Sequence, residues 1–185
     1  MNLSKPDTPI MIMQTDSRRA EELALQEKAD LVMTLEPGPD YRSRNAVIEP
    51  AYHINYLLIA PPEHPLRRKK NVRLQDVITY PLILWAKGSY SRYVVEHALH
   101  QQGLLSKLEV IAETDNSAFT ASCVRAGIGI GIIAGHAKGP LCEGLMSRPL
   151  DALLGRPRIV FVWRKGAVIS PLVLELAATI RESAF

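Results

Sequence analysis

The segment from Leu108 to Ala134, LEVIAETDNSAFTASCVRAGIGIGIIA, contains the order of elements that decides the fold. The apolar residues 108–112 predict a strand, and Asp115-Asn116-Ser117 supply side chains that are preferred where a helix begins. That helix is expected to end at Gly127, and residues 128–134 predict a second strand whose glycines mark close packing or a bulge. Strand, polar turn, helix and strand in this order indicate an α/β fold.

The same alternation extends from this segment toward both ends of the chain. Toward the C-terminus, residues 159–163 predict a strand and 171–183 a helix, with Ser170 as its cap and Pro171 in its first turn. Toward the N-terminus, strands are expected at 10–13, 30–33 and 82–85, and one long extended segment at 46–60. The pattern therefore predicts mixed, mostly parallel sheets, in two lobes that are joined by two crossover strands.

Composition and charge narrow the class of protein. The 185 residues are 47% apolar and 22% charged, with a net charge of +3, which is typical of a soluble globular protein. No apolar run is long enough to span a bilayer, and residues 1–15 lack the pattern of a secretory signal. The two cysteines do not have metal-ligand spacing, so we expect a reduced, cytoplasmic protein. The basic run 67–70 lies in a proline-rich loop without aromatic residues, and we interpret it as solvated rather than DNA-binding.

Catalytic and cofactor motifs receive little support from the sequence. Ser89 lies in Gly88-Ser89-Tyr90-Ser91, which lacks the spacing of a nucleophile elbow. Gly129, Gly131 and Ala134 have the spacing of a dinucleotide-binding motif. They follow a helix and lie within an expected strand, however, whereas the motif requires a strand, then the glycines, then a helix. His97 and His100 lack further metal ligands. We therefore expect no enzyme activity, no cofactor and no metal.

Polar turns that follow strands and begin helices are the recurring chemical feature. The start of a helix leaves backbone N–H groups unpaired and carries positive potential, so it can bind a carboxylate or sulfate. Plain helix capping is the alternative explanation at each turn. Asp115 would repel an anion and could instead accept a hydrogen bond from a ligand. The candidate effector-binding residues are Thr15, Thr34, Ser89, Tyr90, Ser91, Asp115 and Asn116.

Several segments in this order resemble LysR-type transcriptional regulators. The similar stretches are Ala29-Asp30-Leu31-Val32-Met33, residues 52–66 with their His-Pro-Leu turn, residues 74–83, and Glu113-Thr114-Asp115-Asn116 followed by Val124–Gly131. The amino-acid sequence of residues 52–66 and 113–134 is most similar to that of the branch that regulates sulfur assimilation and cysteine synthesis. The resemblance covers nearly the whole chain.

The resemblance implies an effector-binding domain with the two-lobed fold of type-2 periplasmic binding proteins. Lobe I would comprise residues 1–55 and 150–185, and lobe II residues 56–149. The winged helix-turn-helix and the first strand and helix of lobe I are expected to be missing, so DNA would be contacted only through the missing domain. The implied partners are a small anionic effector and other copies of the chain, in a dimer or tetramer, without a membrane. A stand-alone solute-binding protein and an enzyme on the same fold are the alternatives.

Overall fold

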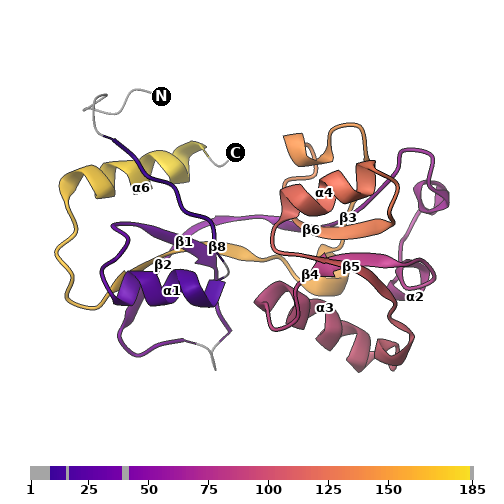
Figure 1. Ribbon diagram of the computed structural model, residues 1–185, viewed down its shortest axis with the longest axis horizontal. Coiled ribbons are helices and arrows are strands. Elements are labelled where there is room, and N and C mark those ends of the chain that lie inside the picture. Colours follow the sequence, from indigo (N-terminus) through magenta and orange to yellow (C-terminus); the bar gives the residue numbers. More distant parts are fainter. Residues whose placement is uncertain (1–8, 16, 39–41, 184–185) are drawn as a thin grey trace. The chain divides into compact units, whose positions relative to one another are not determined.

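The computed structural model describes residues 9–15, 17–38 and 42–183. The chain forms two compact units and passes between them twice, after His53 and after Pro157 (Figure 1). Unit 1 contains residues up to 53 and from 158 onward, and unit 2 contains residues 54–157. In the division expected from the sequence, the chain passes from lobe I to lobe II between residues 55 and 56 and returns between residues 149 and 150. The first boundary lies slightly earlier in the structure, and the second lies later because Leu150 and Leu154 are buried in the core of unit 2.

Unit 1 is built on an antiparallel sheet in the order β1-β8-β2. Side chains alternate along β8, so Val160 and Val162 pack with helix α1, whereas Phe161 and Trp163 pack with helix α6. The elements of this unit are α1 (Ser17–Leu25), β1 (Val32–Leu35), β2 (Ala46–His53), β8 (Arg158–Arg164) and α6 (Pro171–Ser183).

Unit 2 has a mixed five-stranded sheet in the order β5-β4-β6-β3-β7. Its core lies on both faces of the sheet: α3 packs on one face with Leu82 and Leu84, and α4 packs on the other with Ile83. Its strands are β3 (Asn55–Ala60), β4 (Leu82–Trp85), β5 (Val110–Thr114), β6 (Ile130–Gly135) and β7 (Met146–Pro149). Its helices are α2 (Leu74–Val77), α3 (Tyr90–Gln101), α4 (Ser117–Arg125) and α5 (Asp151–Leu154), with 3-10 turns at Pro65–Arg68, Leu105–Lys107 and Pro140–Cys142.

Two glycines allow helix α4 and its flanking strands to pack closely. A Cβ atom at Gly131 would lie 2.7 Å from Thr120 Cγ2, and one at Gly129 would lie 2.9 Å from the Pro81 carbonyl oxygen. Neither distance is compatible with a side chain, so these positions require glycine. The glycines of the stretch 127–131 therefore serve packing.

The structure confirms the α/β class and mixed sheets and corrects two details. Among the strand pairs that the structure describes, β4–β5 and β4–β6 are parallel and the others antiparallel, so the expected predominance of parallel pairing is wrong. The reason is that β8 returns between β1 and β2 in the opposite direction, and β3 pairs antiparallel with both its neighbours. The expected strand at 10–13 is also wrong, because these residues have no pairing partner among the described strands and their side chains are 51–90% exposed.

Candidate functional site

Two of the expected polar turns lie at one edge of the unit 2 sheet. Strands β4 and β5 run parallel, with Trp85 opposite Thr114, so the residues that follow each strand emerge side by side. The Ala86 amide donates to the Thr114 carbonyl oxygen at 2.9 Å, which joins the two turns directly. The segments 86–91 and 115–117 therefore form one polar edge.

The turn after β4 uses its two serines differently. Ser89 caps α3, its Oγ accepting from the Arg92 amide at 3.3 Å, and the preceding turn requires Gly88 at φ +86°. Ser91 is buried, and the Tyr56 hydroxyl lies 3.5 Å from its Oγ. Burial is also the main reason that the pKa of Tyr56 rises to about 12. Ser89 and the half-buried Tyr90 thus face the edge, whereas Ser91 belongs to the core.

The turn after β5 places Asn116, rather than Asp115, at the cap position. Asn116 Oδ1 accepts from the Phe119 amide at 2.8 Å, and its Nδ2 donates to the exposed Asp115 at 3.0 Å. Ser117 follows and binds β6 in both directions, donating to the Ala134 carbonyl oxygen and accepting from the Ala134 amide, each at 3.1 Å. The ends of β5 and β6 and the start of α4 are therefore held together.

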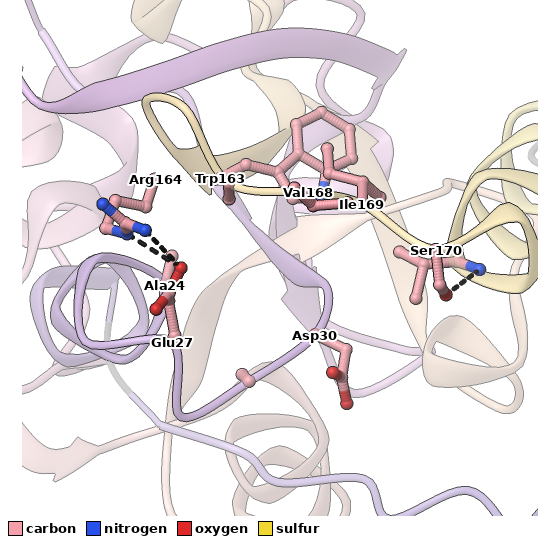
Figure 2. A pocket seen from close by; sticks show the side chains of 11 residues that line it. Ala24, Glu27, Asp30, Trp163, Arg164, Val168, Ile169 and Ser170 are labelled. Atoms are coloured by element: carbon pink, nitrogen blue, oxygen red, sulfur yellow. Dashed lines mark hydrogen bonds and ion pairs between the residues drawn. The ribbon is translucent and has the colours of Figure 1, made fainter.

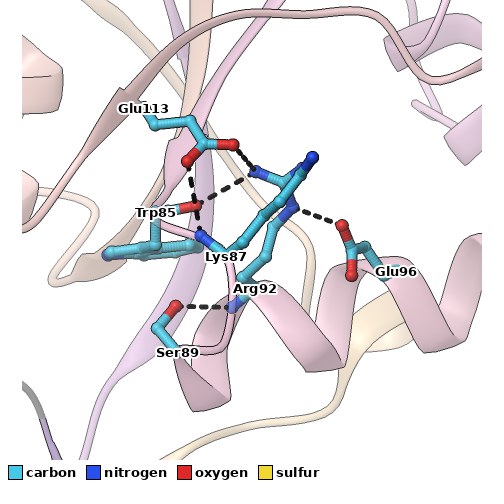
Figure 3. Close-up of polar contacts among 6 residues, drawn as sticks. All are labelled: Trp85, Lys87, Ser89, Arg92, Glu96 and Glu113. Atoms are coloured by element: carbon cyan, nitrogen blue, oxygen red, sulfur yellow. Dashed lines mark hydrogen bonds and ion pairs between the residues drawn. The ribbon is translucent and has the colours of Figure 1, made fainter.

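A buried arginine that sequence reasoning missed ties this edge together. Arg92 is 3% exposed and donates to the Trp85 carbonyl oxygen at 3.1 Å and to Glu96 at 2.6 Å (Figure 3). Its guanidinium also lies 3.5 Å from Glu113, whose other carboxylate oxygen accepts from the Lys87 amide. The sequence signal for this ion pair is the spacing of Arg92 and Glu96, which lie four residues apart on one helix.

The two remaining candidates lie in unit 1. Thr15 is exposed and comes two residues before α1. Thr34 lies in β1 and is 8% exposed, and its Oγ1 is buried with no hydrogen-bond partner among the residues that the structure describes. A buried hydroxyl without a partner is uncommon in folded proteins and is therefore a candidate contact for a ligand.

Metal and membrane features are not found in the described part of the chain. The residues described contain no group of three or more His, Cys, Asp or Glu side chains that could hold a metal ion. None of the helices that the structure describes combines the length and apolar character that crossing a bilayer requires.

Two α/β units with polar helix starts at strand ends are typical of domains that bind small molecules. Comparison with known families then identifies the class: residues 2–184 match the family described as "LysR substrate binding domain". The chain belongs to this family, as the resemblance had indicated.

Similar curated proteins include transcriptional regulators of the sulfur branch. The chain is 27% identical over 92% of its length to the HTH-type transcriptional regulator CysB of Burkholderia cenocepacia, of which it covers 54%. It is 24% identical over 89% of its length to the regulator SsuR of the same organism, of which it covers 52%. The chain thus spans about half the length of these relatives.

Solved structures support the same two-lobed, periplasmic-binding-protein-like fold. The cofactor-binding domain of the Cbl transcriptional regulator matches with a TM-score of 0.77 at 20% identity, over 92% of this chain and 74% of that one. The effector-binding domain of QuiR in complex with shikimate matches with a TM-score of 0.75 at 15% identity, over 92% of this chain and 79% of that one.

Proposed function

We propose that this chain is the effector-sensing domain of a LysR-type transcriptional regulator and that its effector is a small anion. Effector binding changes the arrangement of lobes and subunits in the regulator, and this change alters transcription. Family membership over residues 2–184 is the observation that supports this class of function most directly. The named relatives are regulators, which favours this proposal over a stand-alone solute-binding protein.

The proposed effector contacts are, for each unit by itself, the polar edge in unit 2, and Thr15 and Thr34 in unit 1. The starts of α3 and α4 provide positive potential without a fixed countercharge. Ser89, Tyr90 and Asn116 lie where a ligand could exchange hydrogen bonds with them, and Asp115 would accept from a ligand hydroxyl or amine. Ser91 is buried behind this edge and stabilises it through its hydrogen bond with Tyr56.

The remaining partners follow from the same proposal. Units 1 and 2 would be the two lobes, and DNA would be contacted by another part of a longer regulator, since the relatives are named as HTH-type proteins. Self-association as a dimer or tetramer is supported by exposed apolar side chains on unit 2, namely Ile111, Phe119 and Ile128. A regulator of transcription would act in the bacterial cytoplasm.

The experiment is thermal unfolding of the chain with sulfate, thiosulfate, O-acetylserine, N-acetylserine and benzoate. A ligand at about a hundred times its Kd stabilises the folded state by roughly 2.7 kcal/mol. Thr15→Ala and Thr34→Val should each reduce that ligand-induced stabilisation. Thr79→Ala is the control, because Thr79 is an exposed residue near α2 whose hydroxyl donates to the nearby Asp76 carbonyl oxygen.

Each result of this experiment has a defined meaning. An anion that stabilises the protein, with the effect reduced in Thr34→Val and kept in Thr79→Ala, supports the proposed site. An anion that stabilises all three variants equally moves the site away from Thr15 and Thr34. If none of the anions shifts the transition, the proposal of an anion-sensing domain fails for this chain.

A further inference from the structure

A pocket of about 230 Å³ lies in unit 1, away from the proposed effector contacts (Figure 2). One wall comes from the end of α1 and the turn that leads to β1, and the other from the end of β8 and the loop that leads to α6. Thr15 precedes α1 and Thr34 lies near the end of β1, so both are at the opposite ends of these elements. The pocket is therefore a separate site within unit 1.

The indole of Trp163 provides an unused hydrogen-bond donor in the wall of this pocket. Trp163 is 5% exposed, and its Nε1 is buried with no hydrogen-bond partner within residues 9–15, 17–38 and 42–183. An indole N–H can only donate, and leaving a buried donor unpaired destabilises the folded state. Figure 2 shows Trp163 beside Val168 and Ile169 of the loop. The Val168 side chain is fully exposed, so it can move aside for a ligand without losing buried contacts.

The pocket also carries positive potential at one side and negative charge at the other. The thirteen-residue helix α6 begins at its rim, where Ser170 Oγ accepts from the Val173 amide at 3.3 Å. The positive end of this helix favours a carboxylate. Glu27 and Asp30 line the opposite wall. Glu27 is neutralised by Arg164, whose Nε lies 2.9 Å from it, whereas no described cation pairs with Asp30.

We propose that this pocket binds a small α-amino acid with an apolar side chain. The carboxylate accepts a hydrogen bond from the Trp163 indole and lies toward the start of α6. The ammonium group pairs with Asp30, and the apolar side chain packs against Ile169 and Val173. Neither an anion nor a cation alone satisfies both sides of the pocket, so the molecule recognised is a zwitterion.

The test is titration calorimetry of the chain with L-valine and with two molecules that each retain one of its charges. Isovalerate keeps the carboxylate and side chain, and isobutylamine keeps the ammonium and side chain. We expect saturable binding of L-valine and binding at least about tenfold weaker for the other two, as the loss of a charged contact predicts. In a Trp85→Phe background, L-valine should also change the emission of Trp163, which is then the only tryptophan in the chain.

Two variants and one control assign the binding to this pocket. Trp163→Phe removes the N–H and Asp30→Asn removes the charge with little change of shape, and each should weaken L-valine binding about tenfold. Thr34→Val should leave it unchanged. Absence of saturable valine binding, equal binding of isovalerate, or insensitivity to both Trp163→Phe and Asp30→Asn would overturn the proposal. Weakening by Thr34→Val would assign valine to the proposed effector site instead, and it would also overturn the proposal.

Discussion

Replacing Thr34 by valine should stabilise the unliganded protein while impairing its response to effector. The Thr34 hydroxyl is buried without a partner in the described part of the chain, and such burial costs about 1–3 kcal/mol in protein mutational data. Valine has nearly the same shape and suits a strand, and it adds a buried methyl group of about 0.8 kcal/mol. Together these two contributions should raise the free energy of unfolding of Thr34→Val by about 2–4 kcal/mol. For a chain of this length that corresponds to a Tm increase of roughly 4–16 °C.

The same substitution at Thr120 provides a matched control with the opposite sign. Thr120 is fully buried, its hydroxyl lies 2.6 Å from that of Thr114, and it donates to the Asn116 carbonyl oxygen at 3.1 Å. Thr120→Val leaves the buried Thr114 hydroxyl without this partner and should destabilise by about 1–3 kcal/mol. Urea and thermal unfolding of both variants measure the difference. If Thr34→Val lowers stability as Thr120→Val does, the Thr34 hydroxyl has a hydrogen bond in solution and the reasoning is refuted.

Three further changes test the packing and charges of unit 2. Arg92→Met should destabilise the protein by about 2–3 kcal/mol, because the Trp85 carbonyl oxygen loses a charged hydrogen-bond donor. The carboxylates that pair with Arg92 are partly exposed, so water hydrates them in the variant and offsets only some of this loss. The exposed control Arg67→Met should change stability by less than about 0.5 kcal/mol in urea unfolding, and equal costs would contradict a buried role for Arg92. Gly131→Ala should cost about 1–3 kcal/mol through its clash with Thr120, whereas Gly135→Ala should be nearly neutral in the same assay because its nearest neighbour is 3.8 Å away. The hydrogen bond with the Lys69 side chain is the main cause that lowers the pKa of Asp76. Because the folded-state pKa is lowered, the ionised Asp76 stabilises the folded protein above about pH 4, and this stabilisation is lost as the pH falls below this range. Asp76→Asn should therefore reduce the loss of stability on acidification, and an unchanged acid transition would contradict this role.

The elements that were predictable from sequence are those whose signals are local. The helix 171–183 was expected with its Ser170 cap, and the structure has α6 at Pro171–Ser183. The apolar run at 10–13 has the same strand-like composition as 82–85, yet only the second forms a strand. A strand requires a neighbour, and β4 lies between β5 and β6, whereas residues 10–13 have no partner among the described strands. The prediction of strand direction was wrong for a similar reason. Strand β8 pairs with β1 and β2, which are far from it in the sequence, so its direction depends on long-range contacts.

The candidate site shows the same division between local and long-range information. The polar turns at 89–91 and 115–117 can be recognised as caps from the sequence, because capping depends on residues three positions apart. Nothing local distinguishes Ser89, which faces the edge, from Ser91, whose partner Tyr56 is 35 residues away. Arg92 was missed because charged residues on a helix are usually exposed, and its burial depends on the Trp85 carbonyl oxygen and on Glu113 of the next strand.

Thr34 Oγ1 and Trp163 Nε1 are buried polar atoms that have no partner in the portion of unit 1 that is described, and they lie toward opposite ends of its sheet. Each lowers the stability of the unliganded unit, and a sequence selected for stability alone could replace them with valine and phenylalanine at little cost in packing. A ligand that supplies the missing acceptor or donor recovers this free energy only when it is bound, so the same atoms increase the difference between the free and liganded states. That difference is what a sensor needs, because a ligand can shift an equilibrium only by as much as its differential affinity for the two states. The variant Thr34→Val/Trp163→Phe should accordingly be at least as stable as the unsubstituted chain and respond least to either class of ligand.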